Sequence, residues 1–500
     1  MSEEKIRISG DVEVSGAILW KEPSTASGEE DNAEEIDPIL EKKLLRKLDF
    51  TLLPLLALIH CLNFIDRTAI GNAKIAGLEK DLGMQGFDFN IALTTFNVFL
   101  TVASIPSNII TKRVGSIWIA IQVILFGIVS LGTAFVKTYG QLIGTRILLG
   151  LAEAGTLSSL VYLLSWYYRR KEMVIRIGLF LGISPALAGA FGGLLASGLL
   201  SIRDFGVVHT WRKIFFAEGI ITTSVGILLL FFIPGDPLKS RLLSEDERKL
   251  ALARLNADQI VKTNGKKEPA TVKLVLRSLN IWTIACCVYF ILVNISFQGL
   301  SIFLPTVVNS IGHFTVVDAQ LRTVPPYAVA GVWCMIVIFW SFYINSRAIP
   351  IITSLVLNVV GYATALSTKN PQALYAACFF SLAGTEPMAC MLLIWGTDNA
   401  ALDTMRAVTA AAIAGFGTIG TIIAVWTYLP QDAPNFHKGH SLNLAAAALA
   451  VALVVLGAIY LRWENAKRDK GERNNRLRDG MSQEEIQNLG YRHPKFRYQI

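Results

Sequence analysis

The fold is decided by an apolar run near the start of the chain, Phe50-Thr-Leu-Leu-Pro-Leu-Leu-Ala-Leu-Ile-His-Cys-Leu-Asn-Phe-Ile65, which is followed at once by Asp66 and Arg67. A helix of this length can cross the hydrocarbon core of a bilayer. A charge inside a bilayer costs about 2.5–3.5 kcal/mol on insertion scales, and a retained charge faces a protein interior or a water-filled path. The adjacent acid and base therefore mark a candidate functional position in a membrane helix.

Similar apolar segments recur along the 500 residues, which are 53% hydrophobic and 17% charged with a mean hydropathy of +0.48. This composition indicates that a bilayer surrounds the protein. We expect an all-α polytopic membrane protein with twelve spanning helices in two groups of six, near residues 50–72, 90–110, 117–136, 141–164, 174–200, 213–233, 279–300, 324–344, 348–368, 372–396, 407–428 and 441–462. Two such halves with a polar middle segment are the layout of major facilitator transporters, whose substrate site lies between the halves.

Changes in composition divide the chain into five parts. We expect an acidic, disordered cytosolic tail without a cleavable signal peptide (1–45), a six-helix half (46–233), a cytosolic linker (234–277), a second six-helix half (278–462) and a cytosolic tail (463–500). In the linker, Ser244-Glu-Asp-Glu247 predicts the start of a helix.

Basic residues in the loops predict the orientation. Lys112 and Arg113 follow the second segment, Arg169 and Arg170 follow the fourth, and Arg347 follows the eighth. The positive-inside rule then places both termini in the cytosol. Loops and tail also account for the net charge of +8, so no nucleic-acid partner is expected.

The sequence offers no chemistry for an enzyme. It has no phosphate-binding loop of the G-x-x-x-x-G-K-[ST] type, no zinc signature and no nucleophile motif. The six cysteines fit no metal site and are expected to be buried as small apolar side chains. We expect neither a cofactor nor ATP-driven transport.

Four charges in the first half are candidates for coupled transport. Arg67 carries a planar, permanently charged fork that matches a carboxylate, unless Asp66 simply neutralises it. Asp66 and Glu153 are candidate proton carriers, because burial and a nearby arginine oppose one another in setting the pKa of an acid. Arg146 and Glu153 lie two helical turns apart and share one face. The alternative for that pair is a static salt bridge.

Neutral and acidic groups in other segments are further candidates for binding substrate. They are Glu386, which precedes Pro387, and the amides Asn63, Asn97, Asn294 and Gln298. Each amide could equally bond to a neighbouring helix, and Glu386 could lie near a membrane surface. We interpret Trp395, Trp426 and Tyr428, near segment ends, as interface anchors.

Several motifs together resemble one family. Leu62-Asn-Phe-Ile-Asp-Arg-Thr-Ala-Ile-Gly-Asn-Ala-Lys-Ile-Ala-Gly77 resembles the first-helix signature of the fungal anion:cation symporter (allantoate permease) family of the major facilitator superfamily. Further similar stretches follow in order: Arg146-Ile-Leu-Leu-Gly-Leu-Ala-Glu-Ala-Gly155, Ser165-Trp-Tyr-Tyr-Arg169, Phe303-Leu-Pro-Thr306, Arg322-Thr-Val-Pro-Pro-Tyr327, Asp432-Ala-Pro434 and His493-Pro-Lys-Phe-Arg-Tyr498. The second half and tail look most like members described as high-affinity nicotinic acid transporters.

The resemblance implies proton-coupled uptake of a small organic anion, such as nicotinate or a related carboxylate, across the plasma membrane by a functional monomer. It places the anion contact on Arg67 and proton handling on Asp66 and Glu153, with Arg146 as the partner of Glu153. The chain departs from the family pattern at Ala69, where Asn is frequent, and at Met405, where a basic residue is frequent. Substrate choice therefore need not follow the family.

Two other functions stay open at this point. A drug:proton antiporter on the same fold usually has a Gly-Pro pair in the fifth segment, whereas here Ser184 precedes Pro185. A nutrient sensor that does not transport usually has an enlarged cytosolic domain, and these tails are short. We therefore favour uptake of an anion.

Overall fold

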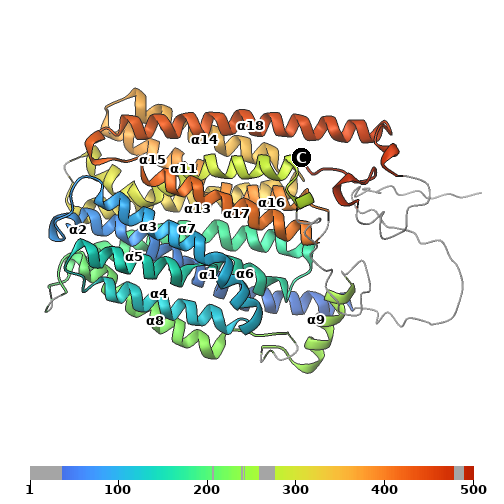
Figure 1. Cartoon of the computed structure of the whole chain (residues 1–500), viewed down its shortest axis with the longest axis horizontal. Helices are drawn as coiled ribbons and strands as arrows, with labels where there is room; N and C mark the ends of the chain where they lie inside the picture. The colour runs from blue at the N-terminus through green and yellow to red at the C-terminus, as the bar shows by residue number, and fades with distance from the viewer. Residues whose placement is uncertain are drawn as a thin grey trace, which may run out of the picture.

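Long apolar helices run side by side through the computed structural model, which describes residues 37–204, 206, 208–237, 240, 242–257, 276–312, 314–401, 403–477 and 489–500. Figure 1 shows the helices lying almost parallel, with the N-terminal half below and the C-terminal half above. Ten helices in the described ranges are long and apolar enough to cross a membrane, and Ile117–Thr133 is a shorter apolar helix.

Each of the twelve expected segments corresponds to a helix or a broken helix. The N-terminal half consists of α1 (Pro38–Ile75), α3 (Asp88–Val114), α4 (Ile117–Thr133), α5 (Tyr139–Glu153) with α6 (Thr156–Ser165), α7 (Arg170–Ser201) and α8 (Arg212–Phe232). The C-terminal half consists of α11 (Ile281–Ile311), α13 (Val324–Tyr343), α14 (Ala348–Ser367), α15 (Pro371–Thr385) with α16 (Met388–Asp398), α17 (Asp403–Val425) and α18 (His437–Asp469). Short helices are α2 (Leu78–Asp81), α9 (Glu245–Ala257) and α12 (Val316–Leu321). The predicted all-α fold is confirmed.

The starts of two helices correct or confirm what the sequence predicts. α1 begins at Pro38, inside the expected tail, because the Asp37 carboxylate accepts the Ile39 N–H at 2.8 Å and proline suits the first helical turn. Residues 1–36 lie outside the described residues. The linker helix starts as predicted, since Ser244 and Glu247 exchange side-chain to backbone bonds of 2.9 and 3.3 Å in a capping box.

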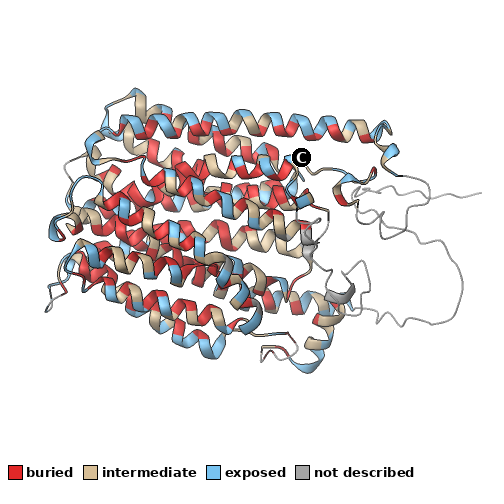
Figure 2. Cartoon of the chain, in the orientation of Figure 1, coloured by how far each residue is buried: buried red, intermediate tan, exposed pale blue. Residues whose placement is uncertain are grey.

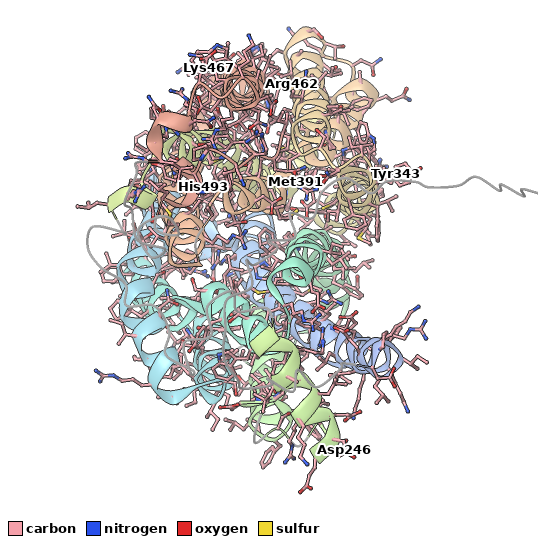
Figure 3. All side chains as sticks on the ribbon, turned by 90° about the vertical axis from the view of Figure 1, so that its right-hand side faces the viewer. Asp246, Tyr343, Met391, Arg462, Lys467 and His493 are labelled. Carbon is pink, nitrogen blue, oxygen red and sulfur yellow. The ribbon has the colours of Figure 1, made fainter. Side chains whose placement is uncertain are left out.

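The expected C-terminal tail is partly ordered structure. α18 continues to Asp469, beyond the predicted end at 462. The segment 489–500 then packs against the same end of the C-terminal half, where Figure 3 places Arg462, Lys467 and His493 together and far from Asp246. The indole N–H of Trp395 donates a hydrogen bond to the Gln499 carbonyl of this segment at 3.0 Å. Trp395 is completely buried, and so is Tyr428 at 1% exposure, so neither is the interface anchor that we expected.

Small residues let the two halves approach closely. A Cβ on Gly71 of α1 would overlap the carbonyl oxygen of Ile302 in α11, and a Cβ on Gly182 of α7 would lie 2.6 Å from the sulfur of Cys334 in α13. Figure 2 shows buried residues concentrated where the halves meet. Large apolar side chains such as Phe231 and Phe232 remain exposed on the outside, as expected for a surface that faces lipid.

Candidate functional site

An ion pair joins two helices of the N-terminal half. Arg67 in α1 donates from Nε to Oε2 of Glu153 in α5 at 2.8 Å. The side chain of Glu153 is fully buried, whereas that of Arg67 keeps 22% exposure. The guanidinium also lies 5.7 Å from the centre of the Phe96 ring in α3. Arg67 is therefore held by an acid and an aromatic face while its side chain stays partly exposed.

Asp66 makes a separate contact. Its carboxylate accepts a hydrogen bond from the Ser130 hydroxyl of α4, and its second oxygen has no partner among the described residues. Neighbours on a helix point about 100° apart. Asp66 and Arg67 consequently face different helices, and simple neutralisation of one by the other does not describe them.

Arg146 lies buried beside these groups without a direct ion pair in the described part of the chain. Its guanidinium centre is 5.3 Å from the Phe215 ring, and its Nε and Nη2 have no hydrogen-bond partner there. The acids whose charge acts on it are Asp66, Glu153 and Glu218. The direct partner of Glu153 is Arg67 of another helix, so the alternative of a static salt bridge between Arg146 and Glu153 does not describe this conformation.

Sequence analysis missed Glu218 of α8. Its side chain is buried at 3% exposure, and neither carboxylate oxygen has a hydrogen-bond partner in the described ranges. The signal was available, because Glu218 interrupts an apolar segment just as Asp66 does. The cluster therefore contains three acids and two arginines: Asp66, Glu153, Glu218, Arg67 and Arg146.

His60 is a second missed residue, on the helix face that carries Arg67. It precedes Arg67 by seven residues, or about two turns, and Asn63 lies between them on the same side. The His60 Nδ1 and the Asn63 amide nitrogen are both buried and unpartnered within the described chain. Phe64, one residue further, touches Phe297 of α11 with ring centres 5.7 Å apart. This face of α1 thus looks toward the C-terminal half and offers polar groups there.

Corresponding helices of the two halves are broken beside an acid. Glu153 is the last residue of α5, before the left-handed Gly155, and Glu386 follows α15 directly before Pro387. Glu386 is buried at 1% exposure. It lies against the backbone of Ala186 in α7, which belongs to the other half. Interrupted segments at matching positions in two halves are the usual sign of a transporter binding site.

The remaining candidate amides differ in their hydrogen-bond partners. Asn294 donates to the Gly417 carbonyl of α17 at 2.9 Å, and Asn97 donates to the Leu93 carbonyl of its own helix at 2.9 Å. Both amide groups therefore serve helix packing or their own helix in this conformation. Gln298 is half-buried, four residues after Asn294 on the same helix.

Two six-helix halves, with a cluster of buried charges in the first half, form the architecture of a membrane transport protein. The Major Facilitator Superfamily model matches residues 56–457. The chain belongs to that superfamily.

Relatives and solved structures agree with this assignment. The chain is 30% identical over 439 residues to the MFS-type transporter efuF of Hormonema carpetanum, covering 87% of this chain and 88% of the relative. It is 28% identical over 461 residues to the high-affinity nicotinic acid transporter of Saccharomyces cerevisiae, covering 92% and 85%. A bacterial homolog of the human lysosomal transporter Spinster, solved in an inward-facing and unoccupied conformation, superimposes with a TM-score of 0.62 at 17% identity, covering 81% and 96%.

Proposed function

We propose that this transporter takes up a small organic anion, a monocarboxylate such as nicotinate, together with protons by alternating access. The observation that carries the proposal is the pairing of Arg67 with Glu153. A substrate carboxylate and the Glu153 carboxylate would compete for the same guanidinium. Substrate binding would then leave Glu153 buried without its cation, and a buried carboxylate without a counter-charge favours its protonated form.

The surroundings of the pair suit an anion with an apolar body. The Arg67 side chain keeps 22% exposure, and a ligand would reach its guanidinium from that side. Phe96 offers an aromatic face next to it. The unpartnered amide nitrogen of Asn63 is a further donor on the same face of α1. The resemblance to a nicotinic acid transporter supports a carboxylate in this place.

The other charges would carry the proton further. Asp66 and Glu218 surround Arg146, and a proton arriving at one acid changes the charge that the others experience. Glu386 would contribute from the C-terminal half. With both termini in the cytosol, uptake across the plasma membrane would run from the outside toward the end of the bundle that carries α9 and the segment 489–500.

The test is uptake of radiolabelled nicotinate and a panel of other carboxylates by cells that produce the chain, at acidic and neutral external pH. We expect one of these acids to accumulate faster at acidic pH, and Arg67→Ala to abolish its accumulation. Arg203→Ala, at an exposed position outside the spanning helices, is the matched control and should leave uptake unchanged. Accumulation that survives both Arg67→Ala and collapse of the proton gradient would refute the proposal. Export of a cationic drug would instead indicate an antiporter.

A further inference from the structure

A cavity of about 290 Å³ lies inside the C-terminal half, away from the charge cluster. Its walls are the last turns of α11 and α14, the beginning of α15, and the residues that lead into α18. These elements meet at the upper left of Figure 1, at the opposite end of the bundle from the segment 489–500. Because Arg67 and Glu153 belong to the other half, this cavity is distinct from the proposed transport site.

The polar lining of the cavity combines three basic residues with neutral hydroxyl and amide side chains. Lys369, His437 and His440 line it, and none of its described lining residues is Asp or Glu. The acid in the adjoining loop, Asp432, does not line the cavity and is 3.4 Å from Lys438. A concave surface with basic groups and low-dielectric walls attracts anions.

A buried histidine and an uncapped helix start lie at this cavity. His440 is buried at 7% exposure, and its Nδ1 has no partner in the part of the chain that the structure describes. The ring is fixed between Tyr362 and Tyr428, with centroids at 5.9 and 5.5 Å. α18 begins after Phe436, whose left-handed φ of 44° directs the turn, and no side chain caps its first N–H groups. An uncapped helix start favours a bound anion.

The rest of the lining is apolar and sets the shape of the ligand. Leu300, Val307 and Ile311 come from α11, and Leu374 comes from α15. Inorganic anions gain nothing from such walls, whereas an organic acid can bury its body against them. We propose that this cavity is a second site that binds a small carboxylate with an apolar body. On the predicted orientation it opens to the outside.

The test uses the full chain in nanodiscs of zwitterionic lipid, carrying Arg67→Ala to disable the proposed transport site. We expect saturable binding of radiolabelled benzoate in this background. Lys369→Gln and His440→Leu should each weaken it about tenfold, because each removes a hydrogen-bond donor or a positive charge. Lys137→Gln is the matched control, since Lys137 is exposed, belongs to the N-terminal half and does not line the cavity.

Three results would overturn the second site. They are no saturable binding in the Arg67→Ala chain, binding that both substitutions in the cavity leave unchanged, and competition by inorganic phosphate as strong as by unlabelled benzoate. Lys369 is exposed, so its substitution does not threaten folding and keeps the test valid even if His440→Leu is unstable. Failure of uptake in intact cells bears only on the proposed function, because the binding assay does not depend on transport.

Discussion

Arg67 and Glu153 are separated by 86 residues in sequence, yet their side chains meet at 2.8 Å and connect α1 to the end of α5. The buried acid belongs to a broken helix, and the partly exposed base belongs to the helix that faces the other half. A ligand that competes for the base therefore acts directly on a buried proton acceptor. This relationship links the anion and the proton in the proposed mechanism.

Removing Arg146 should destabilise the N-terminal half. Arg146→Met removes a buried cation on which Asp66, Glu153 and Glu218 all act, and only Glu153 then keeps a direct cationic partner, Arg67. Leaving a buried charge uncompensated costs about 3–5 kcal/mol. Thermal unfolding of the purified chain in detergent should show a clearly lower midpoint. Adding Glu218→Gln should recover part of the loss, because one buried charge disappears. An Arg146→Met chain as stable as the unaltered one would show that the acids do not depend on Arg146.

A side chain at Gly71 should obstruct the contact between the halves. Gly71→Ala places a Cβ against the Ile302 carbonyl, so α1 and α11 can no longer approach as they do here. We expect transport to fall at least tenfold while the protein still reaches the membrane, as measured by uptake per molecule detected at the surface. Gly198→Ala is the control, since a Cβ on Gly198 meets nothing within 4 Å. Equal uptake by the two variants would contradict this arrangement.

Asn399 should anchor the segment 489–500. Its Oδ1 accepts the Gln499 N–H at 2.8 Å, and its Nδ2 donates to the Gln499 carbonyl at 3.0 Å. Asn399→Ala removes both bonds, and we expect it to lower the free energy of unfolding by about 1–3 kcal/mol. Limited proteolysis should then cut this segment faster. Gln372→Ala, with an exposed side chain at the other end of the bundle, should not change the cleavage rate.

The fold was predictable because the length of an apolar run is enough to identify a membrane-spanning helix. Helix ends were less predictable where local capping decides them, as at Asp37 and Pro38, or where a helix extends beyond its apolar part, as at Asp469. The ordered structure of the segment 489–500 was not predicted, because this polar segment is held by hydrogen bonds to residues of the folded bundle such as Trp395.

The sequence predicted which charged residues belong to the candidate site better than it predicted which of them form ion pairs. A charged residue within an apolar run is easy to recognise in the sequence. Glu218 could have been found by this criterion, just as Asp66 was. Which arginine binds Glu153 depends on the packing of α1 against α5 rather than on spacing within one helix. Sequence alone could not decide that Arg67 would be nearer than Arg146.

Proton movement driven by substrate is the most direct test of the coupling between Arg67 and Glu153. The measurement is the change in internal pH of proteoliposomes when the transported carboxylate is added outside, with the unaltered chain and with Glu153→Gln. Glutamine keeps the size of the side chain but cannot carry the proton. We predict acidification with the unaltered chain, and none with Glu153→Gln even though carboxylate exchange across the membrane persists. Equal acidification by both chains would contradict the assignment of the coupled proton to Glu153.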